Sequence, residues 1–375
     1  MVGFFLKLCY YIIMKITNIK VKNFRNYEDV NLDINEDVNV FLGKNAQGKT
    51  NLLEAIFFCG VGKSFRTAKD KEVIKWNNES AKIILNIQKK YRKEKIEIIF
   101  SNKNKKTVII DGISVRRIGD LLGELPVVFF SPDELKLIKE SPEERRKFMN
   151  IDISQTNKRY FYLLSRYEKI LANRNKLLKE TKSLDVLKST IDIWDKVLVE
   201  VAEKIIIERE KFIEEISPYA QKAHLYISNG KEVLKIKYKG FEKQKNEDYK
   251  TSLLKALQKN LEKDFKLGYT SIGPHRDDID IYLNDIEVKS FGSQGQQRTA
   301  SLSLKLAELE IIKERTGEYP ILLLDDVFSE LDKERRERLI KFTTRTQTFI
   351  TCTDFDLSGK NFKIFNIENG KIKKK

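Results

Sequence analysis

The sequence contains few cysteines and few prolines. Its three cysteines, Cys9, Cys59 and Cys352, lie far apart and show no Cys-x-x-Cys spacing. This pattern argues against a disulfide framework and a thiolate zinc site, and it favours a reducing cytoplasmic compartment. The six prolines form no proline-rich linker, which argues against domains strung along flexible connections.

Long hydrophobic runs are also scarce. The only long apolar stretch, residues 2–14, is interrupted by Lys7 and is too short to span a bilayer. No small-residue cleavage site follows it. We therefore expect no membrane segment and take Met14 as the start of the folded chain. Residues 1–13 are then a spurious upstream extension, with a signal segment as the alternative.

The remaining composition is that of a folded, basic protein. With 375 residues and 41% hydrophobic side chains, the chain is longer than a single hydrophobic core usually accommodates, and we expect two structural units. Subtracting 55 acidic from 71 basic side chains gives a net charge of +16. Such a surface attracts a polyanion or an acidic membrane face. The alternative is a solvated lysine-rich surface.

The first third of the chain predicts strands and one helix. The apolar run 38–42 ends at Gly43, and apolar residues recur at helical spacing after Thr50, so strand, glycine loop and helix follow in order. Asp111-Gly112 is a hairpin signal within a predicted antiparallel patch. The strands of that patch are expected at 83–87, 96–100, 107–110 and 113–115.

The middle of the chain changes to a helical pattern. Ser141-Pro142-Glu143-Glu144 predicts a helix start, and apolar residues then keep a 3.6-residue period over 160–178 and 193–206, which predicts two long helices folded back on each other. Further on we expect strands at 233–238, 279–283 and 321–324 and helices at 253–265 and 299–312. The expected architecture is an α/β domain, 14–132 and 266–375, with a mainly helical insert at 133–265.

The glycine loop matches the GxxxxGK[ST] phosphate-loop pattern and lies between a predicted strand and a predicted helix. Glycines let backbone N–H groups converge on phosphate oxygens, Lys49 is expected on the β- and γ-phosphates of ATP, and the Thr50 hydroxyl on Mg²⁺. An ordinary glycine turn is the alternative. The predicted nucleotide-binding residues here are Gly43, Lys44, Asn45, Ala46, Gln47, Gly48, Lys49 and Thr50.

A carboxylate pair follows the predicted strand 321–324. The strand is wholly apolar, and an unpaired charge at its buried tip would be costly without a function. Asp325 is therefore the predicted Mg²⁺ ligand. Asp326 is predicted to orient or deprotonate the attacking water and, with Lys49, to be catalytic. The alternative for Asp326 is a helix-capping aspartate.

The segment 290–298 precedes the helix predicted from Thr299. Ser293 and Gly295, with Gln296, stand where backbone N–H groups and a helix dipole attract an anion. Ser-x-Gly-Gln resembles the signature loop of ABC-type ATPases, and residues 329–332 resemble the D-loop of that family. A serine-glycine turn that caps a helix is the alternative. The resemblance implies that each signature loop covers ATP held by a second copy, giving an ATP-dependent homodimer.

From Met14 onward the chain resembles the RecF family of bacterial recombination mediator ATPases, which have an ABC-type head. The segments that carry the resemblance are 22–27, 43–56, 63–66, 130–135, 141–146 and 273–278. In a transporter ATPase the signature loop would follow the phosphate loop after fewer residues, and a glutamine would couple the site to membrane helices; here a long helical insert intervenes and 127–133 contain no glutamine. Structural-maintenance proteins have coiled-coil inserts far longer than the insert of this chain. The resemblance implies that Arg25 and Asn26 lie near the adenosine end of ATP, with a surface arginine as the alternative. His275 is expected in a structural turn rather than in a metal site.

The resemblance implies a weak, DNA-stimulated ATPase of DNA repair and replication, linked to the SOS response, that clamps DNA as a dimer and releases it on slow hydrolysis. The implied partners are single-stranded and gapped or duplex DNA and RecR- and RecO-type proteins. Two alternatives stay open: the ATPase subunit of a membrane transporter, and an interaction module with a structural nucleotide. Candidate phosphate contacts, or else a solvated face, are Lys63, Arg66, Lys69 and Lys71.

Overall fold

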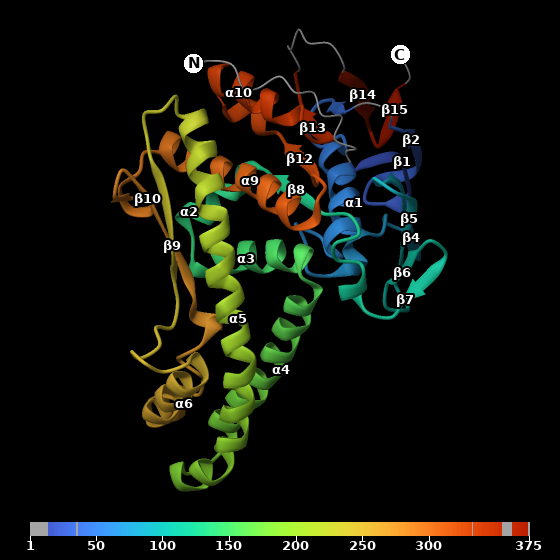
Figure 1. Cartoon of the computed structure of the whole chain (residues 1–375). Coiled ribbons are helices and arrows are strands. Elements are labelled where there is room, and N and C mark those ends of the chain that lie inside the picture. Colours follow the sequence, from blue (N-terminus) through green and yellow to red (C-terminus); the bar gives the residue numbers. More distant parts are fainter. Residues whose placement is uncertain (1–13, 35–36, 332, 355–361, 374–375) are drawn as a thin grey trace. The chain divides into compact units, whose positions relative to one another are not determined.

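The computed structural model describes residues 14–34, 37–331, 333–354 and 362–373 (Figure 1). The expected upstream extension, 1–13, and Asp332 of the D-loop-like segment lie outside the described residues. The chain divides into two units. Unit 1 comprises residues 1–132 and 312–375, and unit 2 comprises residues 133–311.

A six-stranded sheet with a parallel core carries the glycine loop of unit 1. Its strand order is β15-β14-β3-β13-β12-β8, and only β15 runs antiparallel to its neighbour. The inner strands are almost wholly buried, as expected for parallel strands made of continuous apolar runs. The strands are β3 (Val38–Leu42), β8 (Val127–Phe130), β12 (Ile321–Asp325), β13 (Thr348–Cys352), β14 (Phe362–Glu368) and β15 (Lys371–Lys373).

A second, antiparallel sheet in unit 1 has the order β2-β1-β4-β5-β6-β7. Its strands alternate buried and exposed residues, and Asp111-Gly112 forms the predicted turn, with φ values of 49° and 82°. Helix α1 (Lys49–Val61) packs against both sheets. The strands are β1 (Lys15–Phe24), β2 (Tyr27–Asp33), β4 (Ser80–Gln88), β5 (Lys93–Ser101), β6 (Thr107–Ile110) and β7 (Ile113–Val115). Unit 1 also contains η1 (Asp70–Val73), η2 (Ile118–Asp120), η5 (Val327–Glu330) and α10 (Lys333–Thr343).

Unit 2 is mainly helical and contains a three-stranded sheet of order β11-β10-β9. Helices α4 and α5 pack against each other as the two predicted long helices, and Asn157 and Ser183 cap their N-termini. The helices are α2 (Lys136–Lys139), α3 (Pro142–Thr156), α4 (Lys158–Glu180), α5 (Leu184–Ile227), α6 (Tyr249–Lys259), α7 (Leu261–Leu267), α8 (Val288–Phe291) and α9 (Gln294–Thr316). The remaining elements are β9 (Leu234–Lys239), β10 (Asp278–Leu283), β11 (Ile286–Glu287), η3 (Pro132–Leu135) and η4 (Pro274–Arg276). Together the two units confirm the predicted α/β fold with an antiparallel patch and a helical addition.

Some helix bounds differ from the sequence prediction. The helix expected over 253–265 is two helices, because Asn260 ends α6 and begins α7. Helix α9 begins at Gln294 rather than Thr299. Residues 266–311 group with unit 2, because β10 pairs with β9 along its whole length and Arg145 binds Asp278 with two hydrogen bonds (2.5 and 3.0 Å). The division into lobes at 133–265 stays a prediction.

Candidate nucleotide-binding site

The glycine loop connects β3 to α1 in unit 1, as the sequence predicted. Two of its residues have left-handed backbone conformations, Ala46 with a φ of 63° and Gly48 with a φ of 113°. A Cβ at Gly48 would lie 2.6 Å from Nδ2 of Asn26. Only glycine therefore fits this position without strain, and the loop can turn tightly into the first turn of α1.

Side chains of the turn between β1 and β2 hold the glycine loop. Asn26 donates from Nδ2 to the carbonyl of Gln47 (2.9 Å) and accepts from Nδ2 of Asn51 (2.8 Å). The Tyr27 hydroxyl donates to the carbonyl of Gly48 (3.0 Å). Because loop carbonyls are satisfied by these partners, the loop N–H groups can be offered to an anion.

Arg25 and the turn between β14 and β15 lie around the same loop. The backbone N–H groups of Asn369 and Gly370 donate to the side chain and the carbonyl of Gln47, at 2.6 and 3.0 Å. Arg25 makes a bidentate pair with Glu54 of α1 (2.5 and 2.8 Å), whose side chain is fully buried. Arg25 is therefore a partly buried ion-pair residue rather than a solvated one. That Arg25 and Asn26 lie near adenosine stays a prediction.

Lys49, the first residue of α1, lies almost wholly buried within the loop, with 7% of its surface exposed. Its ammonium donates to the carbonyls of Gly43 and Lys44, the latter at 3.1 Å. Burial lowers the pKa of Lys49, while the charges of Asp326 and Asp325 oppose that shift. A buried cation beside two carboxylates is suited to binding the polyanionic end of a nucleotide.

Thr50 and Asp325 are in direct contact. The Thr50 hydroxyl donates to Oδ1 of Asp325 (2.8 Å), and the Thr351 hydroxyl donates to the same oxygen (2.6 Å). Burial raises the pKa of Asp325, although both hydroxyls favour its charged form. A hydroxyl and a carboxylate oxygen, both hard donors, fit Mg²⁺, and a bound cation would offset the cost of burying Asp325.

Asp326 follows β12 in a left-handed conformation, with a φ of 52°. Its N–H donates to the hydroxyl (2.9 Å) and the carbonyl (3.2 Å) of Thr351. The carboxylate of Asp326 makes no capping hydrogen bond to η5, so the capping alternative lacks support. Its role in orienting water stays a prediction.

The signature-like loop belongs to unit 2 and begins α9. Ser293 Oγ accepts from the N–H of Gln296 (3.2 Å), and Gln296 Oε1 accepts from the N–H of Ser293 (2.8 Å). These reciprocal bonds form a capping box, which explains why α9 starts five residues earlier than predicted. Ser293 is exposed, and its hydroxyl hydrogen can still be donated to an anion while its oxygen caps the helix.

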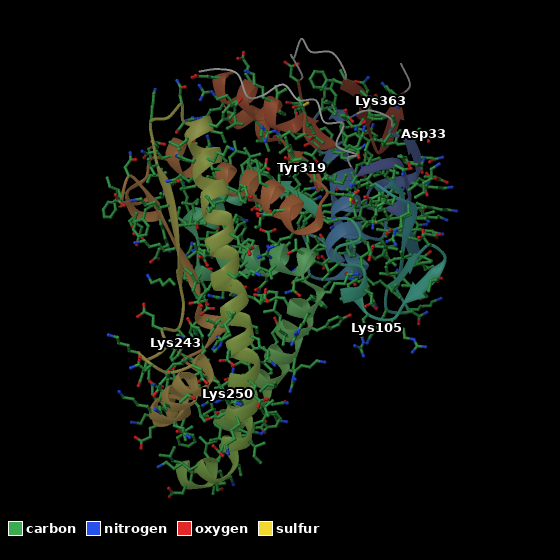
Figure 2. All side chains as sticks on the ribbon, in the orientation of Figure 1. Asp33, Lys105, Lys243, Lys250, Tyr319 and Lys363 are labelled. Carbon is green, nitrogen blue, oxygen red and sulfur yellow. The ribbon has the colours of Figure 1, made fainter. Side chains whose placement is uncertain are left out.

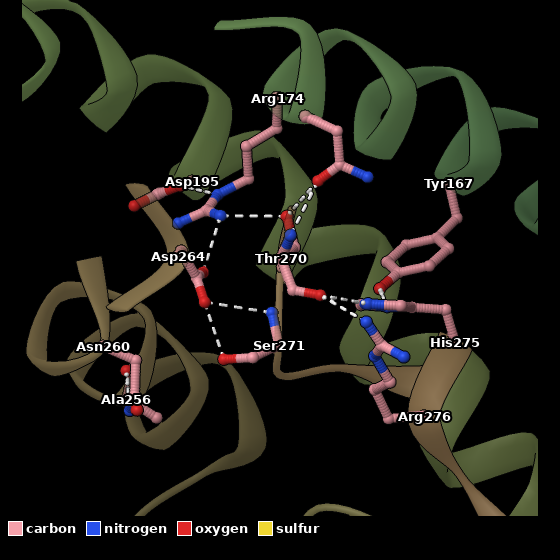
Figure 3. Close-up of polar contacts among 11 residues, drawn as sticks. Tyr167, Arg174, Asp195, Ala256, Asn260, Asp264, Thr270, Ser271, His275 and Arg276 are labelled. Carbon is pink, nitrogen blue, oxygen red and sulfur yellow. Dashed lines mark hydrogen bonds and ion pairs between the residues drawn. The ribbon is translucent and has the colours of Figure 1, made fainter. Parts of the chain in front are cut away.

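His275 lies in a second polar cluster of unit 2, drawn in Figure 3. The Tyr167 hydroxyl contacts Nδ1 (2.6 Å) and the carbonyl of Thr270 contacts Nε2 (2.9 Å). Both ring nitrogens therefore have protein partners, which favours the expected structural turn over a metal ligand. In the same cluster Arg174 pairs with Asp195 (2.6 Å) and Asp264 (2.9 Å) at fully buried positions.

Sequence reasoning missed Thr351, which binds the carboxylate of Asp325 and the backbone N–H of Asp326. The residue pairs with Asp325 across the parallel strands β12 and β13. Apolar runs predict that these strands exist but not their register, so no local pattern identifies Thr351. Asn51 and Tyr27 were missed for the same reason, because their roles depend on contacts between distant segments.

An ABC-type ATPase head is the class of protein that these sheets, the phosphate loop and the carboxylate strand define. The model of the family described as RecF/RecN/SMC N terminal domain matches residues 15–373. The chain is 45% identical to the DNA replication and repair protein RecF of Clostridium perfringens, over 96% of this chain and 99% of that protein. It is 44% identical to the protein of the same name from Clostridium beijerinckii, over 96% and 98%. The chain therefore belongs to the RecF family.

Solved structures agree with this assignment. A structure of the recombination mediator protein RecF-ATP in the RecFOR pathway matches with a TM-score of 0.89 and 38% identity, over 98% of this chain and 99% of that chain. The RecF-ATPrS structure matches with a TM-score of 0.88, also at 38% identity, over 96% and 98%. An Smc head domain from Pyrococcus furiosus, at 16% identity and a TM-score of 0.56 over 96% of both chains, shares the fold.

These findings make the chain an ATP-binding ATPase of the ABC type and give no support to the transporter alternative. Within the part of the chain that the structure describes, no helix combines the length and apolar character needed to cross a bilayer.

Proposed function

We propose that the chain is an ATP-dependent DNA-binding protein of recombinational DNA repair and replication, in which two copies close on DNA with ATP between them. The contact between Thr50 and Asp325 carries this proposal, because it joins the phosphate loop and the carboxylate strand into one site that can respond to a γ-phosphate and its metal. The relatives named as DNA replication and repair proteins support the cellular role.

Each site residue then has a distinct task. Lys49 binds the β- and γ-phosphates, and the loop 43–50 surrounds them with N–H groups. Thr50 and Asp325 hold Mg²⁺, which when bound neutralises phosphate charge. Asp326 orients the attacking water, and its short side chain makes turnover slow.

The second copy supplies Ser293, Gly295 and Gln296. The Ser293 hydroxyl and the N-terminus of α9 bind the γ-phosphate held by the partner's Lys49. ATP thereby favours the paired state, and hydrolysis removes the bond between the copies. Neither copy alone has a complete site, so turnover depends on pairing.

The net charge of +16 supports DNA as the ligand of the paired state. Exposed lysines such as Lys105 and Lys243 point away from the ribbon in Figure 2 and add to the basic surface. Lys63, Arg66, Lys69 and Lys71 are exposed and stay candidates for phosphate contacts. The proposal also includes RecR- and RecO-type proteins as partners, a cytoplasmic location and a link to the SOS response.

The test is the size and turnover of the wild type and two variants with ATP, Mg²⁺ and DNA. The wild type should pair only with ATP, Lys49→Arg should pair and persist because it hydrolyses poorly, and Ser293→Arg should stay single. DNA should accelerate ATP turnover by the wild type. ATP that stays intact through prolonged incubation with DNA and Mg²⁺ would instead favour an interaction module with a structural nucleotide.

A further inference from the structure

A chain of hydrogen bonds connects the end of helix α5 to the signature serine. Gln296, which caps Ser293 through Oε1, donates from Nε2 to Oε1 of Glu232 (2.8 Å). The other carboxylate oxygen of Glu232, Oε2, lies 3.1 Å from Nε2 of His224. His224 lies in the last turn of α5 and is completely buried.

The donors and acceptors around Glu232 are consistent with each other. A carboxylate only accepts, so Nε2 of His224 and Nε2 of Gln296 must both donate to Glu232. Donating from Nε2 fixes the Gln296 amide with its oxygen toward Ser293. On its other side, Nδ1 of His224 lies 3.1 Å from the hydroxyl oxygen of Ser303, which donates its own hydrogen to the carbonyl of Thr299 on α9 (2.6 Å). Ser303 therefore accepts from Nδ1 when both ring nitrogens of His224 carry a hydrogen.

The same side chains therefore join α5 to α9 at two points, at the helix start through Gln296 and two turns later through Ser303. A shift of the last turn of α5 would displace His224, which is the hydrogen-bond partner of both Glu232 and Ser303. The capping box alone does not require this arrangement, since a glutamate at position 296 would cap Ser293 equally well. A glutamine is needed only if position 296 must also donate to Glu232.

We propose that His224 and Glu232 are positioning residues that set the Gln296 amide and hence the direction in which Ser293 presents its hydroxyl to ATP on a second copy. This inference rests on the proposed pairing of two copies through shared ATP, and it names residues outside the nucleotide site that influence this pairing. Glu232 thereby links the last turn of α5 to the signature loop, so His224 and Glu232 affect pairing without themselves contacting nucleotide.

The first test separates the positioning role from a role in folding. Glu232→Ala should weaken ATP-dependent pairing about tenfold, the effect expected when a charge-assisted hydrogen bond is lost. The affinity of the single chain for a fluorescent ATP analogue should change less than twofold, because the phosphate loop is intact. Glu200→Ala is the matched control: Glu200 lies on α5 and pairs with Lys250 (3.2 Å; Lys250 is labelled in Figure 2), away from α9. This control should pair and hydrolyse as the wild type does.

Conservative substitutions at Glu232 and Gln296 test the hydrogen bond between these two side chains. Glu232→Gln keeps an acceptor for Gln296 and should retain more pairing than Glu232→Ala. Gln296→Glu keeps the capping box but places two carboxylates against each other, so it should lose pairing as strongly as Glu232→Ala. Equal loss in Glu232→Gln and Glu232→Ala, or wild-type pairing by Gln296→Glu, would overturn the proposal.

Mixtures of two variants test the positioning role of Glu232 separately from the sharing of ATP between two copies. A mixture of Ser293→Arg and Lys49→Ala tests shared ATP sites, because one complete site forms between an intact phosphate loop and an intact signature loop. Recovered ATP turnover there supports sharing, and no recovery overturns the proposed function. If Glu232 positions its own signature loop, Glu232→Ala mixed with Lys49→Ala should recover turnover as well. Recovery in the first mixture but not in the second would overturn the positioning role alone.

Discussion

Thr351 shows how one hydroxyl positions the two aspartates at the end of β12. It donates to Asp325 and accepts from the N–H of Asp326, so it fixes both residues at the end of β12. Removing the hydroxyl leaves a buried carboxylate with one donor fewer, at a cost of about 1–3 kcal/mol.

Thr351→Val should therefore lower ATP turnover about tenfold at saturating Mg²⁺. The matched control is Thr348→Val on the same strand, whose buried hydroxyl contacts only the carbonyl of Thr346 among its described partners. Phosphate release and thermal unfolding should be measured for both. Similar losses of turnover in the two variants would show that Thr351 acts through stability alone.

Asp326→Asn tests the predicted role in water activation. Asparagine tolerates the left-handed backbone at this position, so the fold should persist. Turnover should fall by about 10²–10⁴, the usual contribution of a general base, while ATP binding stays. Single-turnover hydrolysis with a filter-binding assay for ATP checks both. Wild-type hydrolysis by Asp326→Asn would contradict the assignment.

At the scale of elements, local patterns predicted the strand, glycine loop and α1 correctly because each depends on neighbouring residues. The start of α9 was not predicted, because residues 294–299 are polar or glycine and the apolar helical period begins only after them, although Ser293 and Gln296 have the spacing of a capping box. The break between α6 and α7 at Asn260 was not predicted either, because the apolar period continues across it. The roles of Thr351 and Glu232 depend on pairing between distant segments, which periodicity does not encode.

The turn 273–278 gives unit 2 a dependence on pH. Burial lowers the pKa of His275 to about 4, against about 6.5 in an unfolded chain. Between these values the unfolded chain binds more protons, so stability is full above about pH 6.5 and falls as the pH drops toward 4.

Lowering the pH from 7 to 5 should therefore cost about 1–2 kcal/mol through His275. Urea unfolding of the wild type and of His275→Gln at the two pH values measures this contribution. The wild type should lose more stability than the variant on acidification. An equal loss would show that His275 titrates normally in the folded protein.

At the scale of the whole molecule, the net charge of +16 makes a prediction about salt. If DNA binding neutralises about 6–10 phosphates, affinity should fall about 10³–10⁵-fold between 50 and 200 mM salt. Fluorescence anisotropy with gapped DNA and ATP measures the slope. A flat salt response would show that the lysine-rich surface is only solvated.

Sharing of ATP between two copies is the central claim, and light scattering at matched nucleotide concentrations tests it most directly. With ATP and Mg²⁺ the wild type should have twice the mass of one chain, with ADP the mass of one chain, and Ser293→Arg the mass of one chain with either. A single Ser293→Arg chain that hydrolyses ATP at the wild-type rate would contradict the account.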